Sequence, residues 1–176
     1  MSIESLKDAL PDYAKDLRLN LGGIAGITSL TPQQLWGTAL ATAIASRNPD
    51  VVRAIDATAS EHLTEQAKTA ARSAAAIMAM NNIYYRALHL MQNGEYRTLP
   101  ARLKMNVLAD PGVPKVDFEL WSLAVSAVNG CEACLDAHEG ELKRRSVSAQ
   151  VIQAALRIAA VVNAAAMISA AEGVAG

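Results

Sequence analysis

The sequence reads NGCEACLDAH at residues 129–138, and this stretch contains both cysteines of the chain and one of its three histidines. Asn129-Gly130 is a helix-ending pair, since glycine is costly inside a helix and common just past its end. If a new helix begins at the cysteines, Cys131, Cys134 and His138 stand at positions i, i+3 and i+7 and share one face. The stretch therefore predicts two helices separated by a break, with a dithiol and an imidazole near the start of the second.

The composition of the chain favours close-packed helices. Apolar residues make up 52% of the 176 residues but aromatic ones only 4%, so the core must consist of Ala, Leu, Ile, Val and Met. Alanine is the best helix former, whereas strands prefer β-branched and aromatic residues. We expect an all-α helical bundle that assembles as an oligomer, and the length fits one domain over residues 1–176. A net charge of −1 without a basic run argues against a nucleic-acid partner.

The sequence offers no targeting or membrane segment. Residues 1–5 lack the basic and apolar regions of a signal peptide. No window reaches the roughly 18 uncharged apolar residues of a membrane helix. The nearest candidate, residues 158–171, contains Asn163 and is interpreted as a buried helix. We therefore expect a cytoplasmic protein, and in that compartment a CxxC pair is typically catalytic or metal-binding.

Start and stop signals divide the chain into helices. Thr31 and Gln34 form a capping-box pattern around a proline at the first helical position. Pro11 separates two short helices within residues 3–23, and Asp50 is the expected cap of another short one. The other expected helices are Pro32 to Ser46, Thr64 to Leu88, a short one around Leu103 to Leu108 within the turn-rich connection 92–114, Pro114 to Val128, one from the CxxC pair onward, and a last one capped by Ser146 or Ser148.

An internal repeat relates two parts of the chain. The pairs Leu35-Trp36 and Leu120-Trp121 each open a helix that is followed by a long alanine-rich one. We interpret the chain as two similar helical halves, about 1–92 and 93–176, of which only the second carries cysteines. The alternative is that Leu-Trp pairs simply recur on amphipathic helices.

The cysteine pair points to thiol chemistry. A thiolate rather than a thiol is the nucleophile, and the unpaired N–H groups and the dipole of a helix N-terminus favour the anion. His138 can accept or donate the proton, because imidazoles titrate near neutral pH. Glu119, on the preceding helix, is either a solvated surface glutamate or part of the site. Glu132 and Asp136 are interpreted as facing solvent, away from the cysteines.

The alternative for the cysteine pair is half of a zinc site. Zinc needs four ligands, of which His138 could be one and His62 or His89 a distant second. The chain contains neither a second CxxC nor an HxxxH pattern. We therefore prefer the redox interpretation, with no bound metal or cofactor, and take His62 and His89 as ordinary surface or core histidines.

Short motifs along the chain carry a resemblance to a known family. They are Leu120-Trp121-Ser122, Asn129-Gly130-Cys131-x-x-Cys134, Ala137-His138-Glu139, Met80-Asn81-Asn82 and Met105-Asn106. Together they resemble the alkylhydroperoxidase AhpD family, within the carboxymuconolactone-decarboxylase-like superfold, and the resemblance runs from residues 10–16 onward. It implies an all-helical subunit, a homotrimer and thiol-dependent peroxidase activity toward alkyl hydroperoxides.

The resemblance also implies a role for each residue of the site. Cys134 attacks the peroxide oxygen and becomes a sulfenic acid, and Cys131 resolves it to an intramolecular disulfide and donates a proton. Glu119 and His138 correspond to members of a proton relay. Well-known members carry a histidine directly before the second cysteine, where this chain has Ala133. We expect either that Glu119 and His138 suffice for the relay or that peroxidase activity is lower.

The same resemblance implies the partners. Electrons are expected from dihydrolipoamide on the acyltransferase of a 2-oxo acid dehydrogenase complex, through its lipoamide dehydrogenase. An alternative function is a disulfide reductase, an electron-transfer adaptor that regenerates the peroxiredoxin AhpC, and Ala133 favours it. A decarboxylase acting on a lactone acid, as elsewhere in the superfold, is disfavoured because that chemistry does not use a CxxC pair.

Overall fold

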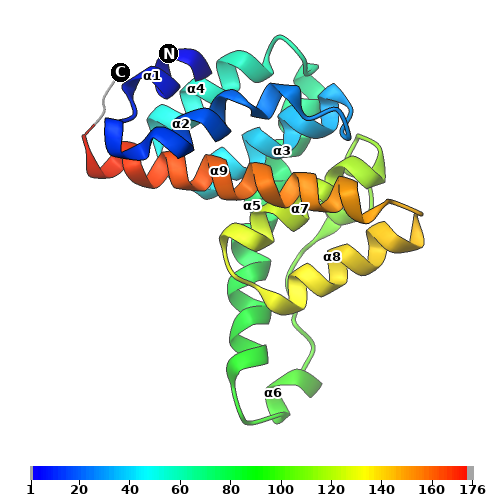
Figure 1. The fold of residues 1–176 in the computed structure, drawn as a ribbon. Coiled ribbons are helices and arrows are strands. Elements are labelled where there is room, and N and C mark those ends of the chain that lie inside the picture. The colour runs from blue at the N-terminus through cyan, green and yellow to red at the C-terminus, as the bar shows by residue number, and fades with distance from the viewer. Residues whose placement is uncertain (1, 174–176) are drawn as a thin grey trace.

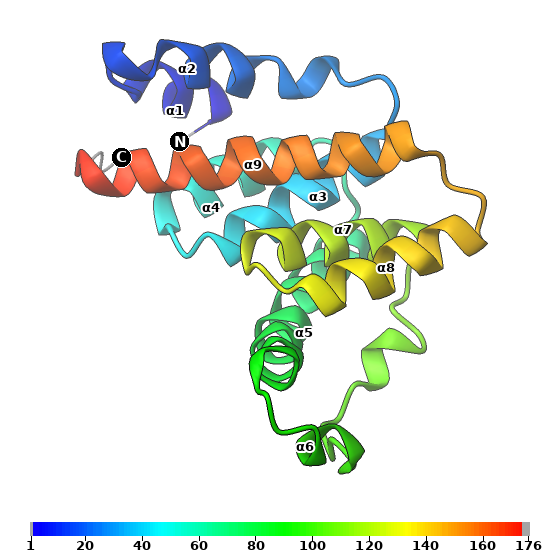
Figure 2. The ribbon, with the colours of Figure 1, turned by 60° about the horizontal axis from the view of Figure 1, so that its bottom comes forward.

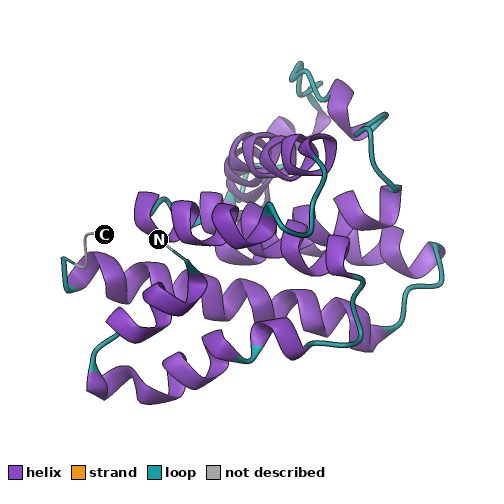
Figure 3. Ribbon diagram, turned by 90° about the horizontal axis from the view of Figure 1, so that it is seen from above, coloured by secondary structure: helices purple, strands orange, loops and turns teal. Residues whose placement is uncertain are grey.

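The computed structural model describes residues 2–173, and within this range every regular element is a helix (Figures 1 and 3). The predicted all-α fold is therefore confirmed. Short 3₁₀ turns at Asp12–Ala14, Ile24–Gly26 and Asn106–Leu108 connect longer elements. In chain order the α-helices are α1 (Ile3–Ala9), α2 (Lys15–Gly22), α3 (Pro32–Ala45), α4 (Pro49–Ala59), α5 (Glu65–Leu90), α6 (Glu95–Thr98), α7 (Lys115–Val128), α8 (Glu132–Arg144) and α9 (Ala149–Ala171).

Side-chain caps begin three helices where the sequence predicts them. Thr31 Oγ1 accepts a hydrogen bond from the Gln34 N–H at 3.2 Å, and Gln34 Oε1 accepts one from the Thr31 N–H at 3.1 Å. Thr64 caps α5, and Ser148 rather than Ser146 caps α9. Each cap satisfies N–H groups that the start of a helix leaves without intrahelical partners.

The predicted cap of α4 is wrong by two residues. Asn48, not Asp50, caps this helix, because Asn48 Oδ1 accepts from the N–H groups of Asp50 and Val51 at 2.9 and 3.2 Å. Pro49 therefore occupies the first helical position, where a missing N–H costs little. Asp50 lies in the first turn, where its negative charge complements the helix dipole.

The connection between α5 and α7 also differs from the prediction. Residues 103–108 contain only the 3₁₀ turn Asn106–Leu108, and the helix of this connection is α6, a single turn at Glu95–Thr98. Arg102 takes left-handed backbone with a φ of 53°, a conformation that does not continue a right-handed helix. The connection leads from the far end of α5 back to the bundle (Figure 2).

Helices α3 and α7 make the most extensive packing of the bundle. α3 packs against α4, α5, α7 and α9, and α7 packs against α3, α5, α8 and α9 (Figure 2). The two helices approach closely because Trp121 of α7 lies against Gly37 of α3, and the indole Nε1 donates to the Gln34 carbonyl at 3.3 Å. Trp121 is fully buried, as is Phe118 one turn before it. The side chains at the contact thus set how near the helices lie.

Helix α5 supports the start of α8. Its first half packs against α3 and α7 through buried alanines, and its C-terminal half extends away from the bundle toward α6 (Figure 1). Helix α8 packs against both α5 and α7. The cysteines at the start of α8 therefore lie where three helices meet.

Helix α9 has the length and composition of a membrane span, with a mean hydropathy of 1.8 over an 18-residue window. In the structure it packs against α2, α3, α4 and α7, and 44% of that window is buried. The buried share is the face that packs on these helices, and a helix that contributes such a face to the core of a bundle is also rich in apolar residues. We interpret α9 as a core helix, in agreement with the expectation for residues 158–171.

The tryptophans of the internal repeat lie in α3 and α7, and both are buried. Their surroundings differ: Trp36 stacks on His62, with ring centroids 5.1 Å apart, whereas Trp121 covers Gly37. The interpretation of the chain as one domain of two similar halves, about 1–92 and 93–176, stays a prediction.

Gly37→Ala is expected to destabilise the fold, although alanine favours a helix over glycine by about 1 kcal/mol. A Cβ on Gly37 lies 2.2 to 2.5 Å from three atoms of the Trp121 indole, so α3 and α7 must move apart. We expect a net loss of about 1–3 kcal/mol in the free energy of unfolding, measured by urea denaturation.

Gly140→Ala in α8 is the matched control for this substitution. Its Cβ meets only the end of the flexible Arg144 side chain, at 3.6 Å, so alanine should be neutral or stabilising there. Equal effects of the two substitutions would contradict the close contact between α3 and α7.

Candidate active site

The turn between α7 and α8 sets the position of both cysteines. Asn129 follows the last residue of α7, and Gly130 takes left-handed backbone with a φ of 64°, which glycine adopts without steric cost. The Cys131 N–H then donates to the Ser126 carbonyl at 3.1 Å, and α8 begins at the next residue. The predicted helix break at Asn129-Gly130 is confirmed.

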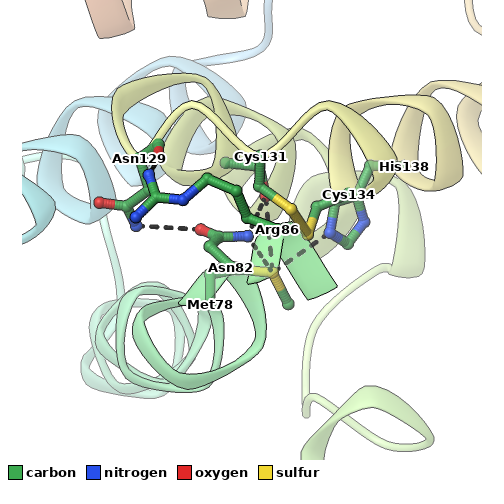
Figure 4. The surroundings of a disulfide bond; sticks show 8 residues. Met78, Asn82, Arg86, Asn129, Cys131, Cys134 and His138 are labelled. Atoms are coloured by element: carbon green, nitrogen blue, oxygen red, sulfur yellow. Dashed lines mark hydrogen bonds between the residues drawn. A yellow bond between two sulfur atoms is a disulfide. The ribbon is translucent and has the colours of Figure 1, made fainter. Parts of the chain in front are cut away.

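Cys131 and Cys134 are joined by a disulfide, with their Cα atoms 5.3 Å apart (Figure 4). Cys131 is the N-cap of α8 and Cys134 lies in its first turn, so both stand at the positive end of the helix dipole. After reduction, this end of the helix favours a thiolate. Cys131 is fully buried, whereas Cys134 is 6% exposed and lines a pocket. Of the two sulfurs, Cys134 is the one that a small molecule reaches first.

Glu119 of α7 and His138 of α8 form a buried pair. His138 Nδ1 lies 2.6 Å from Glu119 Oε2, and Lys115 Nζ lies 3.0 Å from Glu119 Oε1. Glu119 is 6% exposed, so the alternative of a solvated surface glutamate is wrong. An ionised carboxylate can only accept hydrogen bonds, so Nδ1 of His138 carries the proton of this contact. Nε2 is then the ring nitrogen that is available for proton transfer in the site.

The partners of Glu119 keep its carboxyl group ionised. Burial by itself raises the pKa of this group, but the hydrogen bonds and charges of His138 and Lys115 outweigh burial, and the pKa of Glu119 is lowered. The ionised carboxylate in turn fixes the orientation and the tautomer of the His138 ring. A proton-transferring imidazole needs such a positioned partner.

The second nitrogen of His138 faces a methionine of α5. Nε2 lies 3.2 Å from Met78 Sδ (Figure 4). The same sulfur lies 3.7 Å from Ser126 Oγ and 3.8 Å from Asn82 Nδ2. Met78 is fully buried, so a polarisable thioether fills the space between α5, α7 and the histidine.

A buried polar network connects the cysteine turn to α5. Asn82 Nδ2 donates to Ser126 Oγ at 2.9 Å, and Asn129 Nδ2 donates to Asn82 Oδ1 at 2.9 Å. The Arg86 guanidinium donates to the Asn129 carbonyl (Figure 4). Both ends of the Asn82 amide are thus hydrogen-bonded, which holds α5, α7 and the turn in one relative position.

A pocket of about 330 Å³ lies beside Cys134. Ala133 is part of its mostly apolar wall. A pocket of this kind accepts a small organic molecule next to the disulfide. Residues of α5, of the 3₁₀ turn and its flank, and of α8 line it: Met78, Asn81, Tyr85, Met105, Leu108, Ala133, Cys134, Ala137 and His138.

The remaining candidate residues lie outside this pocket. His62 stacks on Trp36, and His89 pairs with Glu132 at 3.2 Å. Glu132 and Asp136 are exposed, as predicted. The described part of the chain contains no group of three or more His, Cys, Asp and Glu side chains that could hold a metal ion.

Sequence reasoning missed the contribution of α5 to the site. Met78 and Arg86 carried no signal, and Asn81 and Asn82 entered only as part of a motif of the resemblance. A signal was present in the two adjacent amides. Asparagines are rarely buried, and these two stand in an alanine-rich helix whose neighbours face the core.

The Glu119–His138 pair predicts a pH-dependent contribution to stability. Because the pKa of Glu119 is lowered in the folded protein, its ionised form stabilises the fold above the ordinary value of 4.5, and this stabilisation is lost as the pH falls through the lower folded value. Glu119→Gln should therefore be less stable than wild type at about pH 7 and approach it in urea denaturation as the pH falls below 4.5. Glu139→Gln removes an exposed carboxylate of α8 and is the control. A Glu119→Gln difference that stays constant with pH would contradict the ion pair.

Comparisons with known proteins bear on this site. A family model described as "Carboxymuconolactone decarboxylase family" matches residues 94–175, which include the cysteine turn. A protein named alkyl hydroperoxide reductase AhpD from Rhodospirillum centenum is 58% identical over 172 residues, which cover 98% of this chain and 92% of the relative. Proteins of the same name from Hyphomonas neptunium and Streptomyces avermitilis are 59% and 60% identical, over 98% and 93% of this chain and 96% and 93% of their own lengths. The chain therefore belongs to the AhpD family of alkyl hydroperoxide reductases.

Proposed function

We propose that this protein is a thiol-dependent antioxidant peroxidase, which reduces alkyl hydroperoxides through a dithiol/disulfide cycle of Cys131 and Cys134. The observation that carries the proposal is that Cys134 lines an apolar pocket together with His138. The second sulfur is within bonding distance of the first, and the relatives carry the name alkyl hydroperoxide reductase.

In the oxidative half-reaction the Cys134 thiolate attacks the terminal oxygen of the hydroperoxide. The S–O bond forms as the O–O bond breaks, which gives a sulfenic acid on Cys134 and an alkoxide. His138 takes the thiol proton and passes it to the alkoxide, while Glu119 accepts the Nδ1–H bond and stabilises the imidazolium. The Cys131 thiol then attacks the sulfenic sulfur, so that the disulfide forms and its proton leaves with the hydroxyl group as water.

The reductive half-reaction needs a dithiol, for which we propose dihydrolipoamide as co-substrate. One thiolate of dihydrolipoamide attacks the disulfide, and its second sulfur closes the cyclic lipoamide disulfide, which returns both cysteines as thiols. The acyltransferase of a 2-oxo acid dehydrogenase complex carries this group, and lipoamide dehydrogenase regenerates it. We place the protein in the cytoplasm, where thiols are kept reduced.

A second function is electron transfer to the peroxiredoxin AhpC, with little peroxidase activity of the protein itself. Ala133 favours this function, because a methyl group in the pocket wall cannot give a proton to the departing alkoxide. The Cys131–Cys134 dithiol then reduces a disulfide of AhpC by the same exchange chemistry.

A peroxide assay coupled to lipoamide and lipoamide dehydrogenase tests the proposal. Wild type should consume cumene hydroperoxide without AhpC. Cys134→Ser should lose all turnover, because no sulfenic acid forms. Cys131→Ser should be reduced beforehand and assayed without dihydrolipoamide, because a free dithiol also reduces a sulfenic acid. It should then consume one equivalent of hydroperoxide and stop, and dimedone labelling with mass spectrometry detects the unresolved sulfenic acid.

Three other results would change the assignment. Consumption that requires added AhpC would replace the peroxidase with the adaptor. If turnover survives in Cys134→Ser and is lost in Cys131→Ser, then Cys131 is the nucleophile and Cys134 the resolving thiol. If the protein decarboxylates a lactone acid and keeps this activity when both cysteines are replaced by serine, its function is that of a decarboxylase.

We also propose that the protein is a homotrimer. An open concavity of about 420 Å³ between α3 and α5 has a mainly apolar lining in which four of the residues are alanines: Ile44, Ala45, Ala75, Ala76 and Ala79, with Arg47, Arg72 and Asn129. Small side chains let a helix of a second copy approach closely. Farther along α5, Ile83 and Leu90 are 53% and 69% exposed. They follow Ala76 by seven and fourteen residues, so they stand on the same face of the helix.

Sedimentation equilibrium should give a mass about three times the 18.6 kDa of one chain. Ala76→Arg adds a positive charge to a concavity that Arg47 and Arg72 also line, and it should shift the mass toward that of one chain, because a buried unpaired charge is costly. Ala57→Arg, at an exposed position of α4, is the control and should leave the mass unchanged. A wild-type mass of 18.6 kDa at micromolar concentration would contradict the trimer.

A further inference from the structure

One polar residue of the pocket beside Cys134 has no role in the proposed dithiol/disulfide cycle. Asn81 of α5 lines this pocket and is 4% exposed. Its Oδ1 is buried and has no hydrogen-bond partner among the described residues. The amide nitrogen of Asn81 also makes no hydrogen bond with the described residues, but unlike Oδ1 it is not fully buried. Nδ2 is therefore the end of the amide that a ligand in the pocket can reach, and it is a donor without a partner.

The neighbouring asparagine shows the contrast. Asn82 uses both ends of its amide, since it donates to Ser126 and accepts from Asn129. Its burial is explained by the network that connects α5 to the cysteine turn. Adjacent helix residues point about 100° apart, so Asn81 faces a different direction from Asn82. The network accounts for Asn82 and leaves Asn81 unexplained.

We propose that Asn81 is the residue that binds the –OOH group of an apolar organic hydroperoxide and presents its terminal oxygen to Cys134. This inference rests on the proposed peroxidase function. The inner oxygen of a hydroperoxide is an acceptor, and the Asn81 Nδ2 group is a donor that a ligand in the pocket can reach. Nδ2 donates to this inner oxygen, which leaves the terminal oxygen free to face Cys134.

Asn81 binds the substrate without taking part in the proton balance. The Cys134 sulfur takes the terminal oxygen, the O–O bond breaks, and the inner oxygen leaves with the organic group and receives the proton held by His138. Negative charge develops on that inner oxygen in the transition state, where an Nδ2–H donor stabilises it. Asn81 thus stabilises the leaving inner oxygen, to which the methyl group of Ala133 cannot give a proton.

The rest of the pocket wall determines the substrate class. Apolar side chains dominate it, chiefly Met78, Met105, Leu108, Ala133 and Ala137. Burial of an alkyl or aryl group against this wall contributes binding energy that hydrogen peroxide, which has no organic group, does not gain. The pocket therefore selects organic hydroperoxides with an apolar group over hydrogen peroxide.

Asn81→Leu, which keeps the size of the side chain and removes its polar atoms, tests the inference in two half-reactions measured by single turnover. Oxidation of the reduced protein by cumene hydroperoxide should slow about tenfold, as for the loss of a hydrogen bond made to the reacting group. Reduction of the disulfide by dihydrolipoamide should change less than about twofold. The urea midpoint should stay equal or rise, because an unsatisfied buried oxygen is removed.

Thr42→Val is the matched control. Thr42 Oγ1 of α3 is also buried without a partner among the described residues, and Thr42 does not line the pocket. This substitution should likewise keep or raise the urea midpoint, but it should leave both half-reactions unchanged. The pair of variants therefore separates the removal of a buried oxygen from the loss of a substrate contact.

The outcomes distinguish this inference from the function on which it rests. A wild type that reduces no hydroperoxide refutes the proposed function. In an active wild type, an unchanged oxidation rate of Asn81→Leu, an equal loss in both half-reactions, or a lowered urea midpoint overturns the role of Asn81. A wild type that reduces hydrogen peroxide as fast as cumene hydroperoxide overturns the substrate class.

Discussion

The contact of Trp121 with Gly37 determines where α7 can lie. Since Gly37 has no Cβ, the indole reaches the backbone of α3, and its N–H is satisfied by a carbonyl of that helix. The same contact determines which residues the other faces of α7 reach. Glu119 contacts His138 of α8, and Ser126 accepts a hydrogen bond from Asn82 in the amide network of α5. One well-packed helix thus positions both the charged pair that fixes the imidazole and the neutral network that holds the cysteine turn.

The parts of the fold that depend on residues close together in the chain could be predicted from the sequence. The capping box at Thr31 and the break at Gly130 depend on a few neighbouring residues, and the structure has both. The cap of α4 was missed because Asn48 and Asp50 both offer a side-chain oxygen, and only the backbone geometry selects the first. The one-turn helix α6 depends on how a long connection returns to the bundle, which no local pattern encodes.

The candidate site was predictable where its residues are near in sequence. Spacing alone placed Cys131, Cys134 and His138 on one face of a helix. The link to Glu119 came from the resemblance, because that contact joins two helices and leaves no periodic pattern. The unsatisfied Asn81 is visible only once the elements around α5 are in place. The roles of the two sulfurs stay predictions.

In the proposed cycle, peroxide and dithiol react in turn at the same atom, because Cys134 is the sulfur that lines the pocket and Cys131 is fully buried. The alcohol must depart before the reductant arrives, which is a ping-pong scheme with parallel reciprocal plots. The two substrates consequently compete for access to this sulfur, and a large excess of either one slows turnover by occupying the enzyme form that awaits the other.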